Sequence, residues 1–317
     1  MSLVLAERRN DLSLAIEQAR EYAEASQAPN TRRVYTTGWN DFVAYCLEHR
    51  FTPLPASPQT VTLYATALAE RVKMSTLRIY LAAIAQKHRE TGLESPVSHV
   101  IVRRVVRGIA RTIGAPQARK SAVTIDNLRA MLLEVGANDL KAARDRAVIL
   151  LGFAAALRRS EIAALRIEDL RFERRGLILT IRRSKTDQEG SGAEIAVPYV
   201  PNKTLCAVRA VKAWLEAAGI TSGPLFRSFN LQRQMLASPI GGRDVANLVK
   251  KLSSKARLEG DYSGHSLRAG FATSAAAAKA SLDAIARTTR HKSLSVLMTY
   301  IRPTQAFDDV ALASMIS

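Results

Sequence analysis

The sequence is poor in cysteine and in long apolar segments, and each shortage excludes a class of protein. It has 2 cysteines, Cys46 and Cys206, which are too few for a disulfide-stapled domain and leave no zinc-ligand spacing. We therefore expect a reducing compartment and no metal or cofactor. No apolar run approaches the length of a membrane span, and the N-terminus lacks a basic segment followed by a long apolar core. These absences predict an intracellular, cytoplasmic protein.

Acidic residues are also scarce, because 28 Asp and Glu face 46 Lys and Arg, for a net charge of +18. An excess of this size indicates a polyanionic partner, and nucleic acid is the first candidate. An anionic membrane surface is the alternative, but it normally requires a basic amphipathic helix or a lipidation signal. Here the basic residues are spread along the whole chain, which favours nucleic acid.

Glycine is sparse, β-branched runs are short, and alanine and leucine dominate, so most of the chain is predicted to be helical. In the N-terminal part, Pro29 is expected to end a first helix, and Thr31, Ser57, Ser75 and Ser95 are expected to begin the following ones. The predicted helices cover residues 11–26, 31–49, 57–71, 75–90 and a segment that starts at 95. These residues predict a compact all-helical domain over 1–113.

A basic stretch without any acidic residue runs from Ser95 to Ile125. Its centre, residues 114–117, has the composition of an interdomain linker, and we place the linker at 114–123. A charge run is often only a solvated face, but this one coincides with a domain boundary. The stretch is therefore expected to cross a phosphate backbone. Its candidate DNA-binding residues are Arg103, Arg104, Arg107, Arg119 and Lys120.

The second domain, residues 124–317, is predicted to be mostly helical with a small β-sheet. Thr124 is a candidate N-cap, and the next long apolar helix runs straight into Arg158. Residues 177–181 and 194–198 have the composition of two strands of a hairpin, with Lys185 in the connection. Further helices are expected over 205–218 and 243–258.

Four short motifs follow one another in this domain. They are LRRSEI with Arg158, SKT with Lys185, HSLR with His265 and Arg268, and RHKSLSVLMTY with His291 and Tyr300. Each motif alone is weak evidence of function. Arg158 alone would be interpreted as the C-cap of the preceding helix, and Glu161 as half of a surface ion pair. Arg182 or Arg183 could take the place of Lys185. His265 and Arg268 stand three residues apart, so on a helix they share one face and suit one anion.

In this order and with this spacing, the motifs resemble the tyrosine recombinase (phage integrase) family, and the layout is similar to its two-domain Cre-like members. The resemblance implies that Arg158 and Arg268 clamp the scissile phosphate and that Tyr300 is the nucleophile. It makes Lys185 the hairpin general acid, His265 the proton acceptor and His291 a phosphate ligand, with Glu161 supporting them. Two departures stand out: Ala156 and Arg290 occupy places where glycine is common.

These residue types suit phosphoryl transfer. The transition state gathers negative charge on the nonbridging oxygens, and two planar guanidiniums hydrogen-bond those oxygens bidentately. A phenol, with a pKa of about 10, is a better nucleophile at neutral pH and a better leaving group on reversal than an alcohol. The resemblance implies a 3′-phosphotyrosyl intermediate that needs neither metal nor ATP.

The resemblance also implies a homo-tetramer on two double-stranded DNA sites, with a C-terminal tail helix, 305–317, exchanged between protomers. The alternative for the tail is packing on its own domain. Candidate base readers are Arg78, Lys87 and Arg89 on the helix 75–90, with Arg243 on the other domain. Two other functions stay open: a type IB topoisomerase, and a non-catalytic sequence-specific DNA-binding protein. The complete set of candidate catalytic residues argues against the latter.

Overall fold

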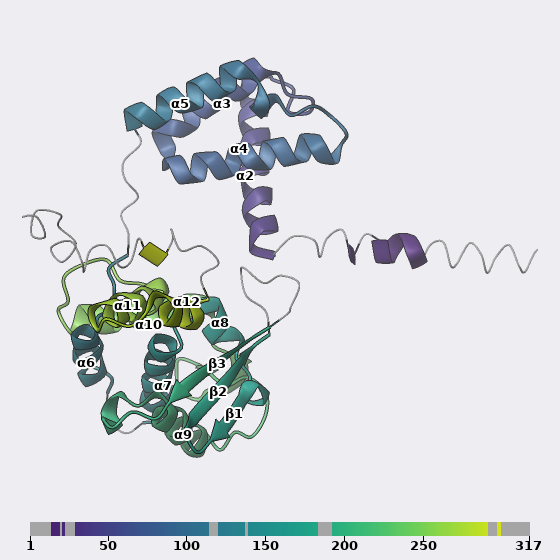
Figure 1. Cartoon of the computed structure of the whole chain (residues 1–317). Coiled ribbons are helices and arrows are strands. Elements are labelled where there is room, and N and C mark those ends of the chain that lie inside the picture. The colour runs from purple at the N-terminus through teal and green to yellow at the C-terminus, as the bar shows by residue number, and fades with distance from the viewer. Residues whose placement is uncertain are drawn as a thin grey trace, which may run out of the picture. The chain divides into compact units, whose positions relative to one another are not determined.

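The chain divides into two compact units, Met1–Gln117 and Ala118–Ser317, shown by a computed structural model (Figure 1). The structure describes residues 14–19, 21–22, 29–113, 120–136, 139–182, 192–290 and 297–298. Helices dominate both units and strands occur in the second, as the sequence predicts. In the described part, no helix has the length and apolarity that a membrane crossing requires.

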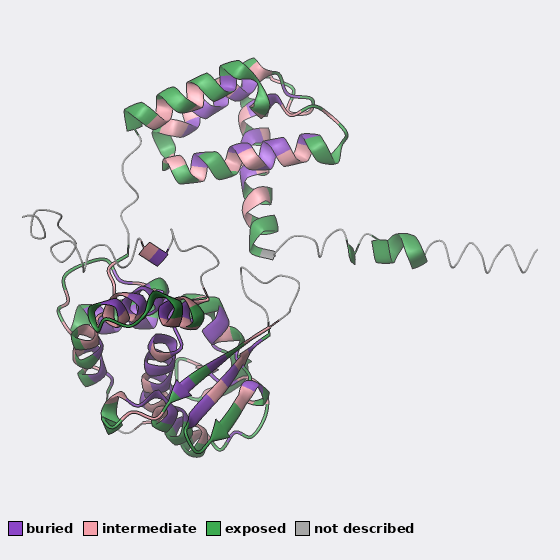
Figure 2. Cartoon of the chain, in the orientation of Figure 1, coloured by how far each residue is buried: buried purple, intermediate pink, exposed green. Residues whose placement is uncertain are grey.

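The N-terminal unit is built from helices packed on one apolar core. Residues 14–19 are helical, and the helices after them are α2 (Pro29–Glu48), α3 (Pro58–Arg71), α4 (Met74–Glu90), the 3₁₀ turn η1 (Pro96–Ser98) and α5 (Val100–Ile113). Fully buried side chains such as Phe42, Tyr64, Leu68 and Ile84 join α2, α3 and α4. Figure 2 shows the buried faces of these helices turned towards one another.

The start signals in this unit were partly wrong. Ser57 caps α3 as predicted, because its hydroxyl accepts the amide of Thr60 at 3.0 Å. α2 begins at Pro29 and not at Thr31, since proline suits a first helical position, where no amide hydrogen bond is lost. α4 begins one residue before Ser75, and Ser95 opens only the short turn η1.

The second unit is built around α7 (Leu140–Ala154), which is buried along most of its length (Figure 2). α7 packs against α9 and α11. The helices around it are α6 (Ile125–Leu133), α8 (Arg159–Ala164), α9 (Ala207–Ala218), α10 (Gly242–Lys255), α11 (Gly264–Ala277) and α12 (Leu282–Thr289), with the 3₁₀ turns η2 (Ile167–Asp169) and η3 (Lys203–Leu205). Thr124 caps α6 as predicted, through the amide of Asn127.

The predicted hairpin is present and belongs to a larger sheet than expected. β1 (Leu170–Glu173), β2 (Gly176–Ile181) and β3 (Ala193–Pro198) form an antiparallel sheet in that order. The register pairs Leu177 with Val197 and Leu179 with Ile195, which puts these side chains on the buried face. β1 and the second pair, β4 (Arg227–Phe229) with β5 (Met235–Pro239), were not predicted because they are short and polar.

Two glycines let the helices of this unit approach closely. A Cβ on Gly152 of α7 would lie 2.8 Å from Ile162 Cδ1 and 2.9 Å from Leu267 Cδ1. A Cβ on Gly270 of α11 would lie 1.9 Å from the carbonyl oxygen of Val123. These distances are below van der Waals contact. A Cβ on Gly152 would therefore force the two side chains on α8 and α11 to shift, and a Cβ on Gly270 would push α11 away from the backbone that precedes α6.

Candidate active site

The candidate active site is built around the turn at residues 155–158, where α7 gives way to α8. The amide of Leu157 donates to the carbonyl of Gly152 at 2.9 Å, and the amide of Ala156 donates to Phe153 at 3.0 Å. These two bonds form a Schellman ending, whose penultimate residue is left-handed. Ala156 has a φ of 47°, which explains why glycine suits this place.

Arg158 follows this turn in extended conformation, with φ −75° and ψ 151°, and is the N-cap residue of α8. Glu161, three residues on, accepts its backbone amide at 2.9 Å and its Nη1 at 2.7 Å. The side chain of Glu161 is 2% exposed and that of Arg158 is 18% exposed. Arg158 therefore does not cap α7, and the ion pair with Glu161 is not a surface pair.

Arg268 and His265 both lie on α11, as the spacing predicts. Arg268 is 1% exposed, and its Nη1 donates to the carbonyl oxygen of Ala156 at 2.9 Å. His265, in the first turn, is exposed. The structure thus ties Arg268 to the turn that leads into Arg158, although 110 residues separate them in sequence (268 minus 158).

Arg290 is part of the same cluster, and sequence reasoning noted it only as a replacement for glycine. It caps α12 with a φ of 54°. Its Nη2 contacts Glu161 Oε2 at 2.6 Å, and its Nη1 donates to the carbonyls of Ala155 and Thr288 at 3.3 and 3.0 Å. Burial lowers the pKa of this guanidinium, and the Glu161 carboxylate opposes that shift. The sequence feature that could have identified Arg290 is that an arginine directly precedes His291, where glycine is common.

The other predicted catalytic residues, Lys185, His291 and Tyr300, lie outside the described residues, as does Arg119. The two described residues near Tyr300 are Leu297 and Met298, which are helical. Leu297 is fully buried with Ala272, Ala276 and Ile285, so its side chain packs on α11 and α12. α12 and Leu297 are therefore held against the helix that carries Arg268.

The predicted DNA-binding residues are distributed over both units. Arg78 and Arg89 on α4, and Arg103, Arg104 and Arg107 on α5, are exposed, whereas Lys87 is half-buried and 3.8 Å from Glu90. In the second unit, Arg243 is exposed near the start of α10, and Lys120 forms an ion pair with Asp261. The charge of Lys120 is therefore partly compensated within its own unit.

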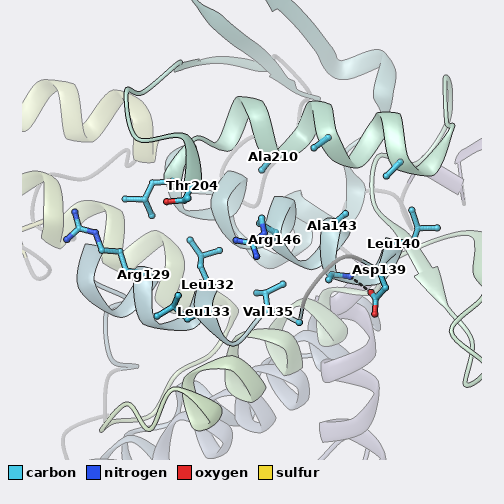
Figure 3. Close-up of a pocket in the computed structure, with 15 residues that line it drawn as sticks. Arg129, Leu132, Leu133, Val135, Asp139, Leu140, Ala143, Arg146, Thr204 and Ala210 are labelled. Atoms are coloured by element: carbon cyan, nitrogen blue, oxygen red, sulfur yellow. Dashed lines mark hydrogen bonds between the residues drawn. The ribbon is translucent and has the colours of Figure 1, made fainter.

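A pocket of about 970 Å³ lies elsewhere in the second unit, between α6, α7 and α9 (Figure 3). Its walls are mainly leucine and alanine side chains, and Arg129 and Arg146 are also among the lining residues. It contains neither Arg158 nor Arg268, so it is separate from the candidate active site. Its apolar lining differs from the cationic lining that a phosphate requires.

A family profile and two related proteins match this chain. The profile of the phage integrase family matches residues 122–306. A protein named integrase/recombinase xerD homolog from Selenomonas ruminantium is 38% identical over 302 residues, covering 94% of this chain and 89% of that protein. Recombinase cre of Escherichia phage P1 is 24% identical over 291 residues, covering 82% of this chain and 80% of its own.

Solved structures share the fold of this chain. A lambda integrase dimer bound to a COC′ core site has a TM-score of 0.62 at 16% identity, covering 94% of this chain and 80% of that one. XerH recombinase bound to a palindromic difH substrate has a TM-score of 0.57 at 16% identity, covering 82% of this chain and 72% of that one. Because the family profile matches more than half of the chain and one relative exceeds 30% identity, the chain belongs to the phage integrase family, the tyrosine recombinases.

Proposed function

We propose that this chain is a site-specific DNA recombinase that cuts and rejoins duplex DNA through a 3′-phosphotyrosyl intermediate at Tyr300. The observation that carries the proposal is the turn at residues 155–158, from which Arg158 emerges and to which buried Arg268 is hydrogen-bonded. Two guanidiniums fixed to one rigid turn form a preorganised site for a phosphodiester. The family to which the chain belongs supports the same reaction.

The arginines stabilise charge in the transition state. A phosphodiester repels an incoming phenolate, and the transition state places further negative charge on its nonbridging oxygens. Guanidiniums that are already oriented need little rearrangement, and a preorganised group of this kind typically contributes about 3–4 kcal/mol. Glu161 orients Arg158 by binding both its amide and its Nη1.

The reaction conserves the energy of the phosphoester bond that it breaks, because a new phosphoester bond forms at Tyr300. The Tyr300 oxygen bonds to phosphorus as the bond from phosphorus to the 5′ oxygen breaks, with the phenol proton passing to His265. Lys185 protonates the leaving 5′ oxygen, and His291 hydrogen-bonds the phosphate. A 5′ hydroxyl of a partner strand then attacks the phosphotyrosine and releases Tyr300. Since one phosphoester replaces another, the cycle requires no nucleotide hydrolysis. The two guanidiniums supply the positive charge that a metal would otherwise provide.

The two units are proposed to hold the duplex as a clamp joined by the basic linker 114–123. The exposed arginines of α4 and α5 support this role for domain 1–113, and Arg243 supports it for domain 124–317. We assign α4 to the major groove and α5 to the phosphates. Binding through these residues should weaken steeply with salt, because each phosphate contact releases a counterion.

Recombination is proposed to take place in a tetramer on two DNA sites, with the tail 305–317 reaching a neighbouring protomer. The apolar residues Phe307, Val310 and Leu312 recur at about helical spacing in that tail, which suits docking on a groove. A chain shortened before residue 305 should still cleave one site but fail to join two. Native mass spectrometry of the protein with two-site DNA measures the assembly.

Covalent trapping tests the reaction. DNA from the native locus is nicked just beyond the scissile phosphate, so that the short fragment with its 5′ hydroxyl diffuses away after cleavage. Wild type should give a protein band shifted by attached DNA in denaturing detergent, and Tyr300→Phe should give none. A shifted band in both would reject Tyr300 as the nucleophile.

Adduct trapping together with assays of plasmid relaxation and strand exchange separates the alternatives. Salt-sensitive binding of the native site without any adduct would favour the non-catalytic DNA-binding protein. Relaxation of supercoiled plasmid by a monomer, with no exchange between two sites, would favour the type IB topoisomerase. Exchange of strands between two sites identifies the recombinase.

A further inference from the structure

One carboxylate in the candidate active site is shared between two guanidiniums. Glu161 contacts Arg158 Nη1 through Oε1 at 2.7 Å and Arg290 Nη2 through Oε2 at 2.6 Å. The side chains of Glu161 and Arg290 are 2% and 11% exposed. In so dry a setting electrostatic interactions are far stronger than in water, and the geometry of each group depends on its partners.

We propose that Arg290 is a positioning residue that holds Arg158 and the end of α12 in one arrangement through Glu161. Its guanidinium joins three parts of the chain: the Glu161 carboxylate on α8, the carbonyl of Ala155 at the end of α7, and the carbonyl of Thr288 at the end of α12. The inference rests on the proposed function, in which Arg158 clamps the phosphate and His291 follows Arg290 directly in sequence.

The charge count gives this contact a second consequence. Arg158 with Glu161 alone would be a neutral pair, which attracts a phosphate weakly. Arg290 supplies a second cation to the same carboxylate, so the three groups together carry one positive charge. Arg290 thus permits Glu161 to orient Arg158 without cancelling the field that the phosphate requires.

The backbone shows that Arg290 occupies its place despite a conformational cost. Its φ of 54° is left-handed, which for a residue other than glycine costs about 1–2 kcal/mol. Glycine at 290 would relieve that strain, and glycine is common there in the family. Arg290→Gly is therefore the informative variant, since it improves the backbone while removing every contact of the guanidinium.

Arg257 offers a matched control. It follows α10 with a φ of 52° and its amide donates to the carbonyl of Ser254, so it is a left-handed arginine at the end of a helix, as Arg290 is. Its side chain is exposed. Arg257→Gly thus removes one positive charge and one left-handed arginine from the same unit without touching Glu161.

The experiment compares wild type, Arg290→Gly, Arg290→Lys and Arg257→Gly on the nicked DNA. Arg290→Gly should lower the rate of covalent adduct formation at least tenfold while DNA affinity changes less than threefold. Arg290→Lys should recover part of the rate, because it keeps the charge but cannot reach carboxylate and carbonyls together. Arg257→Gly should match wild type. An Arg290→Gly rate equal to that of Arg257→Gly would overturn the inference.

A double-variant comparison and an exchange measurement separate this inference from the reaction itself. If Arg290 acts through Glu161, adding Arg290→Gly to Glu161→Gln should slow adduct formation no further; full additivity would contradict it. Without DNA, Arg290→Gly should speed hydrogen exchange in peptides covering 155–164 and 282–290, and Arg257→Gly should not. Unchanged hydrogen exchange in Arg290→Gly would refute the inference, whether or not wild type forms an adduct. Absence of an adduct with wild type would instead reject the proposed function.

Discussion

The two units bury different chemistry. Within the described residues, the buried polar side chains of the N-terminal unit are Thr60 and His88, whereas the second unit buries the charged Arg144, Asp145, Glu161, Asp169 and Arg268. His88 is held by neutral hydrogen bonds: its Nε2 accepts the amide of Ala56 at 2.9 Å, so its Nδ1 donates to Ile84 at 2.8 Å.

This difference teaches where each unit is vulnerable. A core of apolar side chains and neutral hydrogen bonds loses stability gradually as contacts are removed. Each substitution in a buried ion pair costs more stability, because removing one partner leaves the other charge uncompensated away from water. The unit that carries the candidate active site therefore combines its candidate catalytic groups with its most fragile interactions.

The sequence itself provides a reporter for each unit. Its 2 cysteines and 2 tryptophans are divided evenly, with Trp39 and Cys46 in the first unit and Trp214 and Cys206 in the second. Both cysteines are fully buried in the structure. Thiol labelling during urea unfolding thus follows the units separately in the unmodified chain.

The largest effect is expected for Glu161→Ala. Leaving Arg158 and Arg290 without their carboxylate should cost the second unit about 3–5 kcal/mol and abolish adduct formation. Labelling of Cys206 should begin at a lower urea concentration, with Cys46 unaffected. The control is Asp283→Ala, which breaks an exposed pair with Arg287 and should cost less than about 1 kcal/mol. Equal losses would contradict the claim that the buried ion pairs are the fragile interactions of the second unit.

His88→Ala should have the next largest effect, confined to the first unit. It leaves the buried amide of Ala56 without its acceptor and removes a ring packed on Trp39, for a cost of about 2–3 kcal/mol. Labelling of Cys46 should shift to lower urea while that of Cys206 stays. A parallel shift of both cysteines would show that the units unfold as one.

Ala156→Gly should stabilise the second unit by about 1 kcal/mol, because glycine adopts the φ of 47° without strain. The gain should appear as a later midpoint of Cys206 labelling. Gly219, which also ends a helix with positive φ, provides the reverse test, since Gly219→Ala should destabilise by a similar amount. A loss of stability in Ala156→Gly would mean that the Ala156 side chain contributes packing that outweighs the strain.

The smallest effect concerns alkaline pH. Burial raises the pKa of the Cys46 thiol from its ordinary 9.0 to about 11. The folded N-terminal unit therefore keeps a proton that the unfolded chain releases, so its stability should be complete below pH 9 and decline between pH 9 and 11. The pKa of Cys206 is lowered: burial alone would raise it, but hydrogen bonds from the Val200 and Arg209 region outweigh that.

Urea unfolding of Trp214→Phe, followed at Trp39, measures this decline, and Cys46→Ala should reduce it. An unchanged pH dependence in Cys46→Ala would assign the decline to another group, such as Tyr64, whose pKa is raised by burial and by its hydrogen bond to Asp41.

Local signals in the sequence determined much of the fold. Ser57 and Thr124 cap the helices that they were predicted to begin, and residues 177–181 and 194–198, predicted as strands from their composition, form the paired strands β2 and β3. These are contacts within a few residues or between two regular strands, so composition and spacing suffice. Short polar strands such as β1 carry no such pattern and were missed.

The family-like order of the motifs also placed Arg158, Glu161, His265 and Arg268 in one group, but not their geometry. Only packing around Gly152 brings α11 to the end of α7, where Arg268 reaches the carbonyl of Ala156. Only the left-handed ending of α12 turns Arg290 onto Glu161. These contacts join residues more than 100 positions apart, and their strength comes from burial, a property of the folded chain that no single segment carries.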